Sequence, residues 1–171
     1  MKKIILFIFA LIIIFVVYKE VNANEVVIPS ESIRVRVIPN SNSSYDQAMK
    51  MVVKNYLEDG VYSMIGDTKR IDVVRDVVND NIGNINYNIQ NIFDNYKYDM
   101  KFDVDFGYNY FPEKEFKNVI YEEGYYESLV VSIGEAKGDN WWCVLFPNLC
   151  VIEEDDVEYT SLVREFVNKI F

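Results

Sequence analysis

Carboxylates and two cysteines are the side chains of this chain that could carry out chemistry. The 171 residues include 27 Asp and Glu against 17 Lys and Arg, and they include no histidine. The absence of histidine excludes His–carboxylate triads, histidine bases and histidine metal ligands. A net charge of −10 at pH 7 argues against a nucleic-acid binder, because such proteins need basic patches that displace counterions from phosphate. We expect no cofactor, no metal and no small-molecule substrate.

No pair of carboxylates is singled out by its spacing. Two carboxylates can hydrolyse a glycoside, but 27 acidic residues make some close pairs inevitable. The acidic run 153–156 lacks the alternating spacing and the glycine of a calcium loop. A solvated linker is the simpler interpretation of that run.

The first segment has the features of an export signal. Two lysines precede fifteen apolar or aromatic residues at 4–18. As a helix this stretch would be about 22 Å long, shorter than the roughly 30 Å hydrocarbon core of a membrane. Val21 and Ala23 fit the small-residue positions before a signal-peptidase cut, so we expect a signal peptide over residues 1–23. An uncleaved signal anchor is the alternative. Both place the rest of the chain outside the cytoplasm, because the lysines stay inside.

Cys143 and Cys150 lie in the exported part and are separated by six residues that include Phe146-Pro147-Asn148. A turn there would bring the sulfurs together, and a disulfide is permitted in an exported protein. Closing this loop would stabilise the fold by about 2–3 kcal/mol in the chain-entropy model. Two thiols packed as small hydrophobic groups are the alternative. A catalytic thiolate is disfavoured, since no histidine can activate it.

Hydrophobic periodicity predicts the elements that position these residues. A strand is expected over 33–38, and an amphipathic helix follows an S-x-x-Q pattern that begins at Ser44. A second helical pattern covers 71–96, as two helices or as one helix bent near residues 79–83, where asparagines gather. Strands are expected at 100–106, 127–133 and 141–146, the last two as an antiparallel hairpin.

This order of elements predicts an α+β fold. Amphipathic helices pack on one face of a mainly antiparallel sheet in a domain over residues 24–152, preceded by the N-terminal signal helix. Residues 153–171 are expected to form an acidic linker and a C-terminal amphipathic helix.

The run 141–146, Trp-Trp-Cys-Val-Leu-Phe, is apolar on both faces of its expected strand. If helices cover only one face, then one of the two tryptophans lies on the opposite face. A partly exposed tryptophan is a frequent anchor of interfaces. The alternative is a central strand that is buried on both sides.

Two blocks of the sequence stand out by their combination of residues. The first is Ile33-Arg34-Val35-Arg36-Val37-Ile38-Pro39-Asn40-Ser41-Asn42-Ser43, followed by Asp46-Gln47-Ala48-Met49-Lys50. The second starts at Phe111-Pro112 and ends in Ile133-Gly134-Glu135-x-Lys137-Gly138-x-Asn140-Trp141-Trp142-Cys143-Val144-x-Phe146-Pro147-x-Leu149-Cys150. Together they resemble the stage II sporulation protein R family over roughly residues 31 to 151. Asn42, Glu113 and Asn148 depart from the residues common in that family, which are Asp, Thr and Pro.

The resemblance implies a secreted signalling protein of endospore formation. Such a protein is exported from the forespore into the space between the forespore and mother-cell membranes. There it would activate a membrane-bound aspartic protease of the mother cell, the peptidase that processes pro-sigma-E. It would act by protein binding and not as an enzyme. We expect the partner to contact Trp141, Trp142, Phe146 and Pro147, with Arg34 and Arg36 as candidate charged contacts.

Two other function classes stay open at this point. An exported carboxylate-dependent hydrolase of cell-wall glycan would need a deep cleft with two facing acids. A glycan-binding module would instead use stacking on tyrosine and tryptophan rings.

Overall fold

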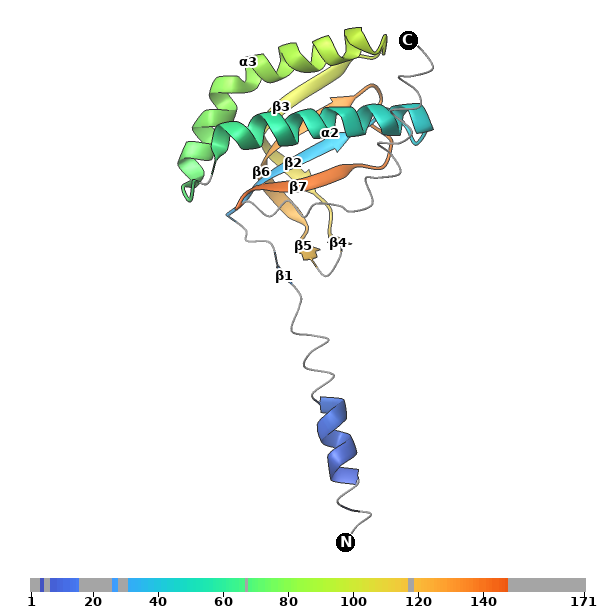
Figure 1. Ribbon diagram of the computed structural model, residues 1–171, viewed down its shortest axis with the longest axis vertical. Helices are drawn as coiled ribbons and strands as arrows, with labels where there is room; N and C mark the ends of the chain where they lie inside the picture. Colours follow the sequence, from blue (N-terminus) through green and yellow to red (C-terminus); the bar gives the residue numbers. More distant parts are fainter. Residues whose placement is uncertain are drawn as a thin grey trace. The chain divides into compact units, whose positions relative to one another are not determined.

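The structure, a computed structural model, describes residue 4 and residues 7–15, 26–27, 31–66, 68–116 and 119–147 (Figure 1). The described residues form two compact units. One comprises residues 31–109 and 125–147, and the other comprises the residues before 30 together with 110–124. Residues 7–15 are helical, and in the described ranges no helix is long and apolar enough to cross a membrane. The expected cleavage site and the expected C-terminal helix lie outside the described residues.

Four strands make a mixed sheet in the larger unit, in the order β3-β6-β2-β7. Their bounds are β2 (Ile33–Ile38), β3 (Phe102–Phe111), β6 (Gly124–Ile133) and β7 (Trp141–Phe146). β2 runs parallel to β6 and antiparallel to β7. The fold is therefore α+β as expected, but the sheet is mixed and not mainly antiparallel.

The prediction that residues 127–133 and 141–146 form an antiparallel hairpin is wrong, because β2 lies between β6 and β7 and pairs with both. The connection over residues 134–140 is long enough for this arrangement, since strands on either side of a third lie about 10 Å apart. As a central strand, β2 has hydrogen-bond partners along both of its edges.

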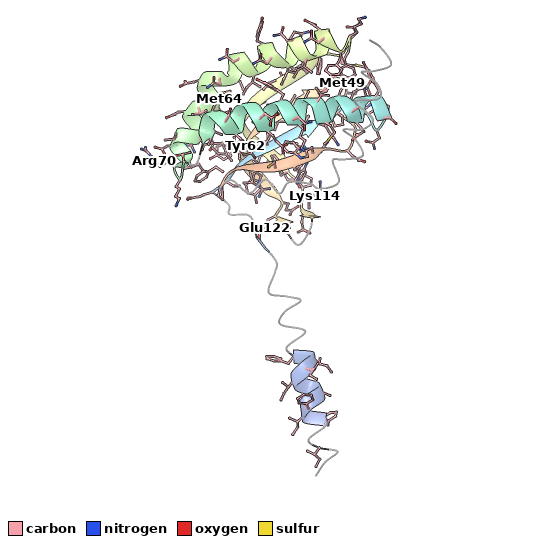
Figure 2. The ribbon with its side chains drawn as sticks, in the orientation of Figure 1. Met49, Tyr62, Met64, Arg70, Lys114 and Glu122 are labelled. Carbon is pink, nitrogen blue, oxygen red and sulfur yellow. The ribbon has the colours of Figure 1, made fainter. Side chains whose placement is uncertain are left out.

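Two helices, α2 (Ser44–Ile65) and α3 (Ile71–Asn95), pack on one face of this sheet, as expected (Figure 1). One buried stripe of α2 faces the core, and Figure 2 labels Met49 and Tyr62 on this helix. The core joins apolar residues of both helices to one face of the strands. Its fully buried members include Ile33, Val37, Val53, Val74, Val78, Ile85, Ile89, Leu129, Val131 and Ile133.

The start of α2 differs by one residue from the expected capping box. Ser43 is the N-cap, and its Oγ accepts a hydrogen bond of 3.1 Å from the backbone N–H of Asp46. The side chain of Gln47 does not return to the cap. Its Nε2 donates instead to the carbonyl oxygen of Ser41 at 3.1 Å.

α3 is one continuous helix, so the alternative of two helices is wrong. Figure 1 shows its ribbon changing direction after the first turns. Two asparagines donate back to carbonyls of their own helix, Asn81 to Val77 at 2.8 Å and Asn86 to Ile82 at 3.0 Å. The amide groups of both side chains therefore have hydrogen-bond acceptors within their own helix.

The smaller unit contains a three-stranded sheet that the sequence analysis did not predict. Its strands are β1 (Val26–Val27), β4 (Lys114–Phe116) and β5 (Val119–Tyr121), in the order β1-β5-β4. β5 is parallel to β1 and antiparallel to β4. Figure 2 labels Lys114 at the start of β4 and Glu122 just after β5.

Candidate functional site

The two adjacent tryptophans lie on opposite faces of β7. Trp141 is 6% exposed and belongs to the core on the helix side, where Lys54 Nζ lies 5.8 Å from its ring centroid. Trp142 is half-buried and is paired across the ladder with Arg36 of β2. The expectation that one tryptophan lies away from the helices is confirmed for Trp142, whereas Trp141 is a core residue.

Trp142, Arg36 and Asn140 form a group that we call the Trp142 cluster. The guanidinium carbon of Arg36 lies 5.5 Å from the centroid of the Trp142 ring, within the range of a cation–π interaction. With its amide oxygen turned toward Arg36, Asn140 accepts hydrogen bonds of 2.6 and 3.0 Å from Nη2 and Nε. Burial lowers the pKa of Arg36, but arginine stays charged in proteins. The cluster therefore fixes a positive charge beside an indole ring.

Arg34, the second arginine expected at a partner contact, is fully buried. Its guanidinium carbon lies 3.3 Å from the ring centroid of Tyr126, and its Nε donates to Ser32 Oγ at 3.5 Å. In this structure Arg34 contributes to packing between β2 and β6. The surface charge on this part of β2 comes from Arg36.

The end of β7 holds the other expected contact residues. Phe146 and Pro147 are half-buried, and Phe146 packs against the core. Cys143 is 4% exposed, and its Sγ lies 3.0 Å from the hydroxyl oxygen of Tyr62. That hydroxyl also donates to the Val144 carbonyl oxygen at 3.3 Å. Cys150 lies outside the described residues, so the disulfide stays a prediction.

The loops that follow β2 and β6, residues 39–43 and 134–139, are joined by hydrogen bonds, and we call them the paired loops. The parallel pairing of the two strands brings both loops to the same end of the sheet. The bonds run from Glu135 N to Asn40 Oδ1 (3.0 Å), from Asp139 N to Asn42 Oδ1 (2.6 Å), from Lys137 N to Asn40 O (3.2 Å) and from Gly138 N to Pro39 O (3.1 Å).

Two glycines permit this close approach. A Cβ on Gly138 would lie 2.3 Å from the carbonyl oxygen of Ser41. Gly134 has a φ of +58°, and a Cβ there would lie 2.3 Å from Asn40 Oδ1. Any larger residue would push the loops apart.

Asp46 lies beneath the paired loops and is 5% exposed. Its carboxylate accepts hydrogen bonds from Asn40 Nδ2 (3.0 Å), Ser41 Oγ (2.5 Å) and the Tyr98 hydroxyl (2.6 Å). Burial by itself would raise the pKa of Asp46, but the hydrogen bonds, led by those from Ser41 and Tyr98, outweigh it and lower the pKa. Burial and the bond to Asp46 raise the pKa of Tyr98 well above its usual value. Asp46 therefore stays ionised and serves as a structural acceptor.

An open hollow lies beside the paired loops. Glu135 on its rim accepts a hydrogen bond of 2.7 Å from Lys137 Nζ within an ion pair. This hydrogen bond lowers the pKa of Glu135. A general acid needs the opposite shift, so Glu135 does not suit the hydrolase alternative. Within the described ranges, no group of three or more Cys, Asp and Glu side chains could hold a metal ion. The hollow is lined by Asn40, Ser41, Asp99, Met100, Lys101, Gly134, Glu135 and Lys137.

The larger unit thus belongs to the class of α+β domains in which two helices cover one face of a four-stranded mixed sheet. A family model described as Stage II sporulation protein R (spore_II_R) matches residues 29–156. Stage II sporulation protein R of Bacillus subtilis (strain 168) is 32% identical to the chain over 128 residues. The chain belongs to the stage II sporulation protein R family.

That alignment covers 75% of this chain and 57% of the Bacillus subtilis protein, so the chain spans little more than half the length of this relative. No solved structure matches the chain.

Proposed function

We propose that this protein is a secreted signal of endospore formation that activates a membrane-bound aspartic protease of the mother cell, the peptidase that processes pro-sigma-E. The N-terminal segment exports it from the forespore into the space between the two membranes. It acts by protein binding and has no enzymatic activity of its own. The observation that carries the proposal is the family match over residues 29–156, and the name of the Bacillus subtilis relative supports a sporulation role.

Activation by contact is favoured by a surface whose side chains are ordered before the partner binds. The Trp142 cluster supplies such a surface, because Arg36 is held by Asn140 at 2.6 and 3.0 Å and lies over the Trp142 ring. Tryptophan and arginine are enriched among the residues that dominate binding energy. A pre-ordered side chain also loses less entropy on binding. Binding would shift the protease toward its active state, most simply by favouring association of the two halves that carry its aspartates.

The Trp142→Ala variant tests this proposal in cells that co-express the protease and pro-sigma-E. Processing is expected to fall at least tenfold, which corresponds to about 1.4 kcal/mol of lost binding free energy, while the variant accumulates outside the cell at the normal level. Arg36→Gln is expected to have a smaller effect of the same sign.

The matched control is Tyr87→Ala on α3, where the side chain is 68% exposed and lies outside the cluster. This variant should support normal processing. Trp141→Ala, by contrast, should lower the folded yield because that ring is in the core. Normal processing by both Trp142→Ala and Arg36→Gln would rule out the cluster as the contact surface.

A further inference from the structure

Strand β7 lies at one edge of the four-stranded sheet, yet its side chains are buried on both faces. Its residues Trp141, Cys143 and Leu145 belong to the core under α2 and α3. Val144 points to the opposite face, because side chains alternate along a strand, and it is 0% exposed. A sheet with helices on one face only can leave its other face in water. Another part of the chain therefore covers β7 on the side away from the helices.

Three basic side chains lie around the first residues of β7, and we call them the β7 basic cluster: Arg36, Lys50 and Lys54. The guanidinium carbon of Arg36 lies 5.5 Å from the centroid of the Trp142 ring. On the helix side, Lys54 Nζ lies 5.8 Å from the centroid of the Trp141 ring. Lys50 Nζ donates to the carbonyl oxygen of Asp139 at 3.1 Å, two residues before the strand begins. The cluster concentrates positive charge in a chain whose net charge is −10.

The burial of these charges favours carboxylates beside them. Lys54 is 4% exposed and forms an ion pair of 3.2 Å with Glu58. The described contacts of the half-buried Arg36 are with neutral groups, the Asn140 amide and the Trp142 ring. Charges that are withdrawn from water are stabilised by opposite charges at short distance. The cluster therefore suits an acidic segment that passes along the edge of β7.

The chain itself supplies such a segment directly after β7. Residues 148–171 include six acidic and two basic side chains, and four of the acids form the run 153–156. The family match ends at residue 156 and so includes this run. The six steps from Pro147 to Glu153 span at most about 22 Å, and a strand of six residues is about 20 Å long. A chain that turns back after Pro147 can therefore bring the run to the start of β7.

We propose that the β7 basic cluster is the docking site of the chain's own acidic run 153–156. The chain turns back after β7, as the predicted disulfide between Cys143 and Cys150 would require, and the carboxylates of the run lie against the cluster. The run is then a docked segment and not the solvated linker that its composition suggests. Docking also covers the outer edge of β7, which could otherwise pair with another chain. The inference concerns contacts within one chain and does not depend on the proposed function.

Cross-linking of the full chain with a carbodiimide tests the docking, because this reagent joins a carboxylate directly to a neighbouring lysine amine. In the monomer band, mass spectrometry is expected to find residues 153–156 joined to Lys50 or Lys54. High salt should reduce these links several-fold, since it screens the charges. The pair Glu135 and Lys137, at 2.7 Å, is the positive control. The exposed Lys97 is the negative control and should link to the run several-fold less.

Links from the run to Lys97 at the same yield as to Lys50 and Lys54 would overturn the docking site, because an undocked segment reacts with every exposed lysine. The absence of links from the run, while the positive control reacts, would also overturn it. Links to Lys50 or Lys54 that occur only in a dimer band would do the same, because the occupant would then be a second copy.

Tryptophan fluorescence gives an independent measurement in the full chain. Trp141 is 6% exposed, so quenching by acrylamide reports mainly on Trp142. Replacing the four acids of the run by their amides is expected to raise the quenching constant about twofold, because the run loses its attraction to the cluster.

The matched control makes the same change of charge at four exposed acids elsewhere in the larger unit and should leave the quenching constant unchanged. Far-UV circular dichroism shows that both variants are folded. Equal quenching constants in the two variants would overturn the docking of the run beside Arg36. The four control positions are Asp76, Asp80, Asp99 and Asp103.

Discussion

Asp46 connects the loop after β2 and the start of α2 with Tyr98, which lies 52 residues further along the chain. Its backbone N–H is capped by Ser43 at the start of α2, and its carboxylate accepts from Asn40 in the loop after β2 and from Tyr98 after α3. A buried carboxylate with several donors is stable only when it is charged. The residue therefore ties the stability of the paired loops to its ionisation.

Asp46→Asn is expected to lower the free energy of unfolding by about 2–3 kcal/mol, because charged hydrogen bonds are lost and an amide N–H₂ replaces one acceptor. The folded pKa of Asp46 lies below its ordinary value. Its contribution is therefore complete above the unfolded pKa of about 3.9 and is lost as the pH falls through the folded pKa. Urea unfolding between pH 7 and pH 2.5 measures this pH dependence, and the loss of stability in acid should be smaller in Asp46→Asn.

Asp103→Asn, at an exposed position of β3, is the control and should lose as much stability in acid as the unmodified chain. Equal acid profiles for the Asp46 variant and the unmodified chain would contradict this role.

Replacing either of two glycines by alanine is expected to change the stability of the fold, in opposite directions. Gly138→Ala is expected to destabilise the fold by about 1–3 kcal/mol, because its Cβ would overlap the Ser41 carbonyl oxygen and the Pro39 ring. Gly83→Ala is expected to stabilise the protein by up to about 1 kcal/mol, since it lies in α3 with no other atom within 4 Å of the added carbon. Thermal unfolding of both variants measures the direction of each stability change. An unchanged stability of Gly138→Ala would show that the paired loops can separate freely.

The sequence indicates the faces of β7 but not the burial of the arginines. Alternation along a strand is enough to predict that Trp141 and Trp142 point to opposite sides. The same rule places Arg34 and Arg36 together on one face of β2, yet Arg34 is fully buried and Arg36 is half-buried. Burial at each position depends on what packs there, such as the Tyr126 ring over Arg34, and a local pattern carries no such information.

At the scale of elements, periodicity predicts the two long helices and the four strands of the larger sheet, but neither the strand order nor all of the bounds. β3 (Phe102–Phe111) and β6 (Gly124–Ile133) extend beyond the expected ranges 100–106 and 127–133. The six residues of β2 and the start of α3 at Ile71 agree with the sequence pattern. The insertion of β2 between β6 and β7 was missed, because a turn-rich connection resembles a hairpin whether or not a third strand lies inside it. The paired loops, and with them the role of Asp46, were missed for the same reason, since they follow from the parallel pairing of β2 with β6.

One ion pair joins α3 to the sheet, and its contribution to stability can be compared with that of an exposed ion pair. Arg75 donates to Glu127 of β6 at 2.5 and 2.8 Å, with the side chains 39% and 11% exposed. A double-mutant cycle with Arg75→Gln and Glu127→Gln is expected to give a coupling of roughly 0.5–1 kcal/mol, because solvent screens the half-exposed arginine.

The same cycle on Glu135 and Lys137, whose side chains are 69% and 73% exposed, should give no measurable coupling. Urea unfolding measures both cycles. A coupling at the exposed pair as large as that between Arg75 and Glu127 would contradict this ranking by burial.

At the scale of the whole molecule, the net charge limits how the protein can bind a partner at a membrane. Without residues 1–23 the chain has 14 basic and 26 acidic residues, a net charge of −12. Anionic membrane surfaces repel such a domain, so in our proposed function it reaches the membrane-bound protease through specific contacts. In our proposed function the Trp142 cluster provides these contacts.

Deletion of residues 2–23 tests most directly whether the protein acts across a membrane. We expect the shortened domain to accumulate in the cytoplasm of the forespore and processing of pro-sigma-E in the mother cell to stop. Replacing the deleted segment with an unrelated signal peptide should restore processing, which separates export from any other role of these residues. Processing at the normal rate by a domain confined to the cytoplasm would contradict the account.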